Sequence, residues 1–220
     1  MKVELKRYYV DVDDLCGEAA ALCYRGPNPA RSLEIAMGNR HNSVTEHSAF
    51  TFLVSGVSRA LLAQLTRHRI ASFSVESQRY IDLSDCFEYV IPPRIKALGS
   101  GAVEDFKRQM NQQHEWYCIW QERLLRAGHK QGEANEDARF VLPNACSTAL
   151  FVTMNARELM HLFELRCCNR AQWEIREMAW HMLTLCKVVA PKMFEDAGPG
   201  CFRGPCPEGK MCCGKPPKKE

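Results

Sequence analysis

The residues from Arg67 to Tyr80 have the side chains that most clearly suggest chemistry. The stretch reads RHRIASFSVESQRY, and it combines cationic side chains with hydroxyl groups. Planar guanidinium forks suit phosphate, and clustered arginines are costly to desolvate without an anion. This composition predicts a site for a phosphorylated ligand, such as a nucleotide. A solvated helix end held by salt bridges would have the same composition, and composition alone leaves that alternative open.

A second group of polar residues follows the capping sequence Asn155-Ala-Arg-Glu158, which predicts a helix start with Asn155 as the cap. Arg157, His161 and Leu165 recur at intervals of four, so they share one helical side, and Arg166 adjoins them. An ordinary exposed stripe would show the same spacing. The neighbouring Cys167-Cys168 pair suggests a nucleophile, but small buried residues are the better interpretation because no His-paired thiol is evident.

The elements that must position these residues alternate between strands and helices, so the body of the chain should contain both. Alternation or β-branched composition predicts strands, and apolar spacing with capping residues predicts helices. The expected strands are 2–10, 50–57, 87–91 and 149–153. The expected helices are 29–38, the segment capped by Ser58, 102–127 with a stripe of Phe106, Met110, Trp116, Trp120 and Leu124, and a long helical region from 156 to 189.

Composition excludes several classes of protein. Hydrophobic residues make up 46% of the 220 residues and charged residues 25%, as in ordinary globular proteins. No apolar stretch approaches the roughly 20 residues of a membrane span, and the N-terminus lacks the apolar core of a secretory signal. The net charge of +3 arises entirely in residues 197–220, so the neutral body argues against nucleic-acid binding. Scattered thiols without a signal predict a reduced, cytoplasmic protein.

Residues 197–220 differ from the body in composition. They are rich in Gly, Pro, Cys and Lys and contain almost nothing apolar, so we expect a domain of residues 1–196 followed by a flexible tail. Four of the 12 cysteines lie in this tail, at Cys201, Cys206, Cys212 and Cys213. We favour a reduced, disordered tail over a metal or redox site, and we assign no metal ligand in the chain.

The exact spacing of the first segment points to a family. Arg67-His68-Arg69 is followed, after seven residues, by Ser77-x-Arg79. This pattern resembles the signature of the flavin-dependent thymidylate synthases. The resemblance continues in order from about His41 to Ile175. Its other parts are Ser43–His47 with the following Phe-Thr-Phe, Arg139–Pro143, Asn155–Arg157, Leu165-Arg166 and Ala171–Ile175.

The resemblance implies an enzyme that methylates dUMP to dTMP. The family takes the carbon from methylenetetrahydrofolate and the hydride from NADPH through FAD, and no enzyme cysteine attacks the pyrimidine. It also implies a single-domain α+β fold with a central, mostly antiparallel sheet packed against long helices. The active enzyme would be a homotetramer with active sites at subunit interfaces, without a nucleic-acid or membrane partner. Two alternatives are a flavoprotein of the same fold with another nucleotide substrate and a nucleic-acid-binding module.

The family's roles carry over residue by residue, with Arg166 and Ser77 as the catalytic residues. His41 matches a histidine near flavin and folate, and we assign it to folate. The flavin-binding set is Ser43, Arg67, His68, Arg69, Ile70, Asn155, Arg157, His161 and Leu165. The dUMP-binding set is Gln64, Ser77, Gln78, Arg79, Arg139 and Arg166.

The sequence departs from the family pattern in a few places. Many members have Asn-Glu-x before the motif serine, whereas Glu76 here is displaced by one residue, so Glu76 receives no role. His161 stands where other members have Asn, and an imidazole can still donate a hydrogen bond. One residue is inserted between His47 and Arg67, which affects a turn rather than the site.

Overall fold

The computed structural model describes residues 1–218, and Lys219 and Glu220, which belong to the predicted tail, lie outside the described residues. The chain forms two compact units. The first unit contains residues 1–54, 64–73 and the chain from Phe151 onward, and the second contains 55–63 and 74–150. Among the described residues, no helix is long and apolar enough to span a membrane.

A four-stranded antiparallel sheet supplies the β part of the fold, and the predicted α+β class is confirmed. The strands occur in the order β1-β2-β4-β3. Three of them overlap strands expected from the sequence, whereas the short β3 was not expected. Their bounds are β1 Lys2–Tyr8, β2 Phe50–Ser58, β3 Ala71–Val75 and β4 Ser147–Met154.

The core of the first unit lies against β2. Phe50, Phe52 and Val54 are fully buried at alternate positions, as the pleat of a half-buried strand requires. Phe50 packs edge-on against Phe194, with ring centroids 5.5 Å apart, and Phe163 packs against the same ring at 5.9 Å. The helices of this unit are α1 Val12–Tyr24, α2 Pro29–Gly38, the 3-10 turn η1 Asn42–His47, α7 Ala156–Arg166, α8 Trp173–Val189 and α9 Pro191–Phe194.

The helix starts confirm several sequence predictions. The Asn28 side chain accepts a hydrogen bond from the Arg31 N–H at the start of α2, and Ser58 accepts one from Leu61 at the start of α3 (Arg59–Leu65). The expectation of one helical region from 156 to 189 is wrong, because residues 167–172 separate α7 from α8. The Gln172 side chain accepts hydrogen bonds from the first N–H groups of α8 and thereby starts a new helix.

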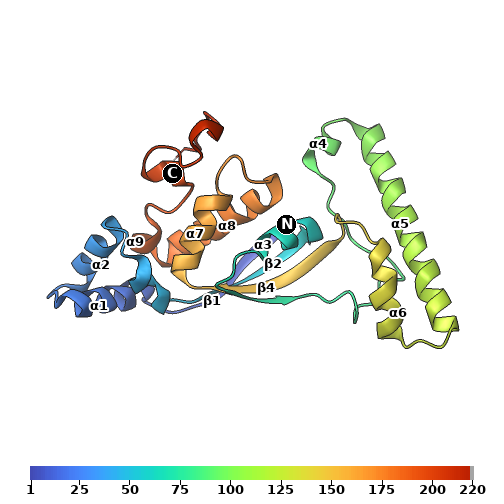
Figure 1. Ribbon diagram of the computed structural model, residues 1–220, viewed down its shortest axis with the longest axis horizontal. Helices are drawn as coiled ribbons and strands as arrows, with labels where there is room; N and C mark the ends of the chain where they lie inside the picture. Colours follow the sequence, from blue (N-terminus) through green and yellow to red (C-terminus); the bar gives the residue numbers. More distant parts are fainter. Residues whose placement is uncertain (219–220) are drawn as a thin grey trace. The chain divides into compact units, whose positions relative to one another are not determined.

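The second unit is mainly helical. It contains α4 Pro93–Lys96, α5 Ser100–Arg126, α6 Gln131–Ala138 and the turn η2 Arg139–Val141. In Figure 1 the long α5 lies beside α6. The strand predicted at 87–91 is wrong, since this segment forms only one isolated bridge, from Tyr89 to Cys146.

The apolar stripe predicted for α5 is correct only in part. Met110 is buried, but Trp116 and Trp120 are 45% and 47% exposed. The helix instead buries Tyr117 and Gln121. Gln121 donates a hydrogen bond to Asn135 of α6 at 2.7 Å, so a polar contact joins the two helices.

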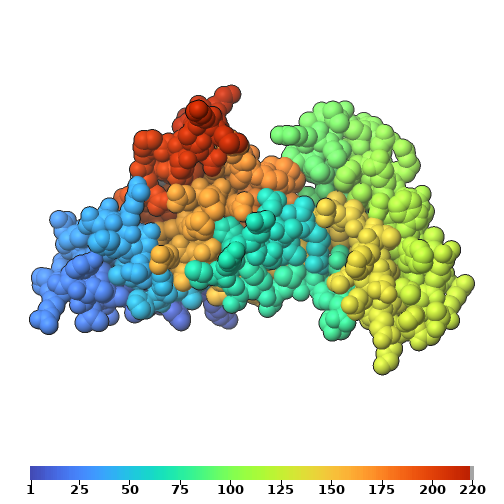
Figure 2. Space-filling view, viewed as in Figure 1, coloured from blue at the N-terminus to red at the C-terminus, as the bar shows by residue number. Residues whose placement is uncertain are grey.

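The tail segment beyond residue 196 forms two 3-10 turns, η3 Gly200–Arg203 and η4 Gly209–Met211. Figure 2 shows it in red against the orange of α7 and α8. Arg203 forms an ion pair with Glu164 at 2.9 Å, and Arg170 donates to the Met211 carbonyl. The flexibility of this tail and the domain boundary before it stay predictions.

Candidate functional site

The first part of the arginine-rich segment, Arg67–Ile70, lies in the first unit, between α3 and β3. Leu61 and Leu65 bury one side of α3, and the chain then turns where the His68 N–H donates to the Leu65 carbonyl at 3.0 Å. This turn buries His68 and leaves Arg67, Arg69 and Ile70 exposed. The predicted flavin-binding residues of this segment therefore form a cationic surface around one buried imidazole.

The buried His68 ring joins the segment to α7. Its Nδ1 lies 2.9 Å from Glu158 Oε1, and Arg166 Nε donates to its Nε2 at 3.3 Å. The ring of His161 lies 5.8 Å from that of His68 in an edge-on arrangement. The structure thus brings together His68, His161 and Arg166 from the predicted sets, and it adds Glu158.

Burial sets the protonation of this group. Desolvation lowers the pKa of His68, and the charges of Arg166 and His161 lower it further against the raising effect of Glu158. Burial also lowers the pKa of Arg166, and the nearby Arg67 adds to the effect. A guanidinium remains charged in proteins, so the group pairs a neutral imidazole with a permanent cation.

The rest of α7 matches the sequence prediction in its cap and in its exposed side. Asn155 accepts a hydrogen bond from the Glu158 N–H at 2.9 Å. The second half of the predicted capping box is wrong, because the Glu158 carboxylate contacts His68 and not the start of the helix. Arg157, His161 and Leu165 are exposed along one side of α7, and Arg157 forms an ion pair with Glu46.

Three other predicted residues of the first unit lie on different elements. Ser43 is exposed in η1, and Gln64 is half-buried in the last turn of α3. His41 precedes η1, and its Nδ1 lies 2.7 Å from the Tyr24 hydroxyl, with the two rings stacked at 6.2 Å. Tyr24 at the end of α1 therefore orients the residue that we assigned to folate.

The remaining dUMP-set residues belong to the second unit. Ser77, Gln78 and Arg79 follow β3, where the Ser77 carbonyl accepts hydrogen bonds from the N–H groups of the turn after it. Arg79 forms an ion pair with Glu136 at 2.7 Å, and Arg139 Nε donates to the Glu136 carbonyl at 3.1 Å. Two arginines predicted to bind dUMP are thus held by one residue of α6.

Glu76, which received no role from the sequence, has a structural one. Its N–H donates to the Ala149 carbonyl at 2.9 Å, and its carboxylate accepts from the Ala149 N–H at 3.1 Å. Its carbonyl accepts from Arg59 Nη2 at 2.7 Å. These contacts continue the pairing of β3 with β4 beyond Val75 and fix the start of the Ser77 turn.

Arg59 is a residue that the sequence reasoning missed. Its Nε is buried and has no hydrogen-bond partner among residues 1–218, and it lies beside a cavity of about 20 Å³ that Ser77 and Gln78 also line. That volume accommodates about one water molecule, which would satisfy the Nε–H. The sequence signal that could have identified Arg59 is its position as a basic residue just after a predicted strand and at the start of an apolar helix.

Glu158 and Glu136 were also missed as site residues. Glu158 stands three positions after a helix cap, where a capping role explains it without any further contact. Glu136 lies in the polar α6, where an acidic residue is ordinary. Only the fold shows that each of them contacts predicted site residues.

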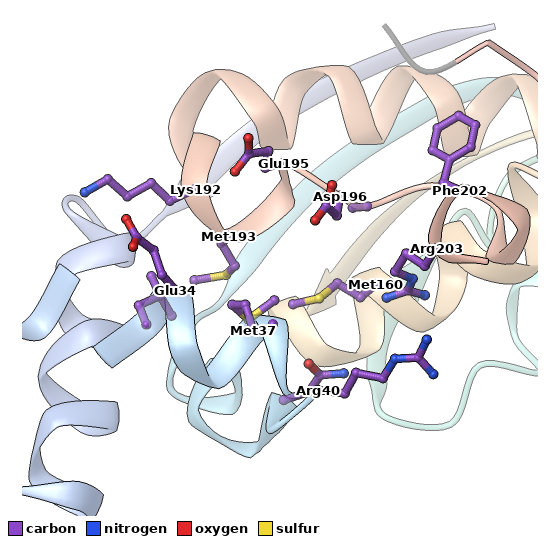
Figure 3. Close-up of a pocket in the computed structure, with 14 residues that line it drawn as sticks. Glu34, Met37, Arg40, Met160, Lys192, Met193, Glu195, Asp196, Phe202 and Arg203 are labelled. Carbon is purple, nitrogen blue, oxygen red and sulfur yellow. The ribbon is translucent and has the colours of Figure 1, made fainter. Parts of the chain in front are cut away.

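A larger hollow, of about 440 Å³, lies elsewhere in the first unit. Figure 3 shows Met37, Met160 and Met193 converging on it from α2, α7 and α9, with Arg40 and Arg203 at one side. Its lining includes none of the predicted site residues. The hollow is therefore distinct from the His68 group.

The cysteines divide by burial. Cys16, Cys146, Cys167 and Cys186 are buried, whereas Cys23 and Cys86 are exposed. The predicted burial of the Cys167-Cys168 pair is therefore confirmed for Cys167, but Cys168 is only partly buried. Burial raises the pKa of the Cys167 thiol to about 12, so this thiol stays protonated at neutral pH. In the tail, the N–H groups of Gly214 and Lys215 donate to the sulfur atoms of Cys212 and Cys213 at 3.4 Å.

Comparison with known proteins identifies the relatives of this chain. The profile of the family described as "Thymidylate synthase complementing protein" matches residues 4–192. A flavin-dependent thymidylate synthase of Geobacter sulfurreducens is 47% identical, over 98% of this chain and 94% of that protein. One of Clostridium tetani is 42% identical over the same shares. One of Pyrococcus furiosus is 44% identical, over 78% of this chain and 70% of that protein.

Proposed function

Because the chain belongs to the flavin-dependent thymidylate synthase family, we propose that it catalyses the reductive methylation of dUMP to dTMP. Methylenetetrahydrofolate is the carbon donor and NADPH is the reductant. FAD, when bound, supplies the redox chemistry between NADPH and the transferred carbon. The observation that carries the proposal is the Arg166 guanidinium held by His68 near the exposed Arg67 of the RHR segment, Arg67-His68-Arg69.

The chemistry of the RHR segment fits a flavin nucleotide. Arg67 and Arg69 are exposed, and within residues 1–218 neither forms an ion pair with a carboxylate. Such guanidinium groups suit the pyrophosphate of a dinucleotide, which accepts forked hydrogen bonds. In this assignment the groups that would hold FAD are Arg67, Arg69 and His68 with Ile70, together with Ser43, Asn155, Arg157, His161 and Leu165.

The second unit supplies donors for dUMP. Arg79 and Arg139 are the cations assigned to the phosphate, and Ser77 and Gln78 add hydroxyl and amide groups. Glu136 holds Arg79 through its carboxylate and Arg139 through its carbonyl. A phosphate would therefore replace the carboxylate at Arg79, while Arg139 keeps its backbone contact and uses its terminal nitrogens. Gln64 of the first unit completes the assignment.

Arg166 and Ser77 are the residues assigned to the reaction itself. Arg166 is a permanent cation, so its N–H groups favour negative charge that develops on a uracil carbonyl. Its partial burial strengthens that interaction, because fewer water molecules screen the charge. Ser77 adds a hydroxyl that can donate or accept a proton in a hydrogen bond.

Assembly and location complete the proposal. The active enzyme is a homotetramer whose sites lie at subunit interfaces, and His41 faces folate. It works in the cytoplasm without a nucleic-acid partner, in keeping with a body of zero net charge. Sedimentation at several protein concentrations tests the tetramer.

Reconstitution with FAD tests the function. Purified protein should acquire a flavin spectrum, NADPH should bleach it with and without dUMP, and dTMP should form only when methylenetetrahydrofolate is also present. Colourless protein that cannot be reconstituted, or flavin-loaded protein that forms no dTMP from the complete mixture, would contradict the proposal. Flavin reduction without dTMP would indicate a flavoprotein with another substrate.

A further inference from the structure

We propose that Glu158 is a positioning residue, which fixes the tautomer of His68 and, through His68, the orientation of Arg166. The inference rests on the proposed function only in giving Arg166 a part in the reaction. The hydrogen-bonded arrangement of the three side chains stands on the geometry of the first unit alone.

The hydrogen bonds determine which nitrogen of His68 carries the proton. Arg166 Nε–H can only donate, and it lies 3.3 Å from His68 Nε2, so Nε2 must offer its lone pair. The proton of the neutral ring is then on Nδ1, which donates to Glu158 Oε1 at 2.9 Å. An Nε2-protonated or doubly protonated ring would point N–H against N–H at Arg166.

Burial makes the contact between Glu158 and His68 effective. His68 is 4% exposed and Glu158 is 7% exposed, so little water competes for the hydrogen bond between them. The Glu158 backbone is itself fixed, because its N–H donates to the Asn155 side chain in the first turn of α7. The carboxylate is thus carried by an ordered helical turn, and its hydrogen bond to Nδ1 determines the ring orientation of His68.

The consequence for Arg166 is geometric. A guanidinium is planar, so holding its Nε–H in one direction restricts the plane of the whole group. The two terminal nitrogens, with four N–H donors, remain for a ligand. The neighbouring Arg67 repels Arg166, and the hydrogen bond to His68 opposes displacement of the guanidinium by that repulsion.

A metal ion is the competing interpretation of the same residues. His68, Glu158 and His161 each place a ligand-type atom within 4.8 Å of the others. Both ring nitrogens of His68 already have hydrogen-bonding partners, and one partner is the cation Arg166. The arrangement therefore favours a chain of hydrogen bonds from Glu158 through His68 to Arg166 over a cation site.

Nitrogen NMR of the full-length protein with labelled histidine, FAD-loaded or flavin-free, tests the tautomer without any change to Glu158. The His68 signal is identified as the one missing in His68→Asn. We expect a neutral ring protonated at Nδ1 at neutral pH. A ring protonated at Nε2, or an imidazolium, would overturn the inference even if every Glu158 variant failed to fold.

Variants on α7 test the consequence for catalysis. Glu158→Gln keeps the size of the side chain but removes its charge, and Glu164→Gln is the matched control, because that carboxylate pairs with Arg203 and not with His68. We expect Glu158→Gln to lower kcat by roughly tenfold or more, as loss of a supporting partner commonly does, with the KM for dUMP and the flavin absorbance nearly unchanged. The control should match the parent.

A double variant separates action through His68 from a merely structural role. If Glu158 acts through His68, then Glu158→Gln in the His68→Asn background should lower kcat no further. An additive loss, or equal losses in Glu158→Gln and Glu164→Gln, would overturn the inference. Failure of the proposed function would be distinguishable from failure of this inference. The unsubstituted protein would then make no dTMP, while the NMR measurement would still test the hydrogen bonds of His68.

Discussion

Arg79 Nη2 lies 2.7 Å from Glu136 Oε2, so the Glu136 carboxylate binds the guanidinium that we assign to the phosphate of dUMP. The side chains are 45% and 39% exposed, which makes this a weak, water-screened pair. The Glu136 carbonyl also accepts a hydrogen bond from Arg139. Because a doubly charged phosphate is the stronger partner, we interpret the pair as one that exchanges its carboxylate for substrate.

The first prediction is that Glu136→Gln lowers the KM for dUMP. The variant removes the competing charge from Arg79 but leaves the backbone carbonyl that holds Arg139. An exposed ion pair contributes at most about 1 kcal/mol, so the decrease should not exceed about fivefold. Steady-state kinetics with varied dUMP measures it, with Glu133→Gln on the same helix as the control. A raised KM would mean that Glu136 preorganises Arg79 and does not compete for it.

The sequence predicts the parts of this fold that depend on local patterns. The alternation of Phe50, Phe52 and Val54 gives β2, and the Asn28 and Ser58 caps mark the starts of α2 and α3. The break between α7 and α8 depends on the Gln172 side chain capping a second helix, which has no strong sequence signal. The exposure of Trp116 and Trp120 depends on which side of α5 faces α6, which is a tertiary property.

The candidate site was predictable as a list of residues but not as a set of contacts. Motif spacing supplies His68 and Arg166, which are 98 positions apart, and the structure joins them through one hydrogen bond. Glu158 belongs only to a helix-capping motif and Glu136 to no motif, and their importance depends on partners that lie far away in the sequence or on burial. A single sequence shows which residue types occur but not which of them meet.

The second prediction concerns Arg166. Arg166→Ala should nearly abolish dTMP formation while circular dichroism and thermal unfolding stay close to those of the parent, because the side chain is half-buried at the end of α7. Arg166→Lys should recover little, since an ammonium lacks both the Nε–H that contacts His68 and the planar pair of terminal donors. Near-parental turnover in either variant would show that the assigned role is wrong.

The third prediction concerns the pH dependence of stability. Burial lowers the pKa of His68 in the folded protein, with Glu158, Arg166 and His161 as the groups around it, while the unfolded residue keeps its ordinary pKa of 6.5. His68 therefore takes up a proton on unfolding when the pH is below its ordinary pKa. The free energy of unfolding consequently falls as the pH drops from about 7 toward the pKa of His68 in the folded protein.

Thermal unfolding across this pH range measures the effect. His68→Asn should show a shallower decline of Tm than the parent, because the ring that titrates is gone while the other histidines remain. Comparing slopes avoids confusion with any constant loss of stability in the variant. Equal slopes in the two proteins would mean that His68 titrates normally in the folded state.

The last prediction tests whether a thiol takes part in the reaction. Cys167 adjoins Arg166, but it is fully buried, and burial raises its pKa to about 12, so almost no thiolate forms at neutral pH. Iodoacetamide should label the exposed Cys23 and Cys86 well before Cys167, as peptide mass spectrometry can show. Cys167→Ala should retain turnover within about twofold, because an inert buried thiol contributes packing and no nucleophile. Loss of turnover without loss of fold would indicate that the thiol acts in the reaction, and it would contradict a mechanism in which no cysteine attacks the pyrimidine.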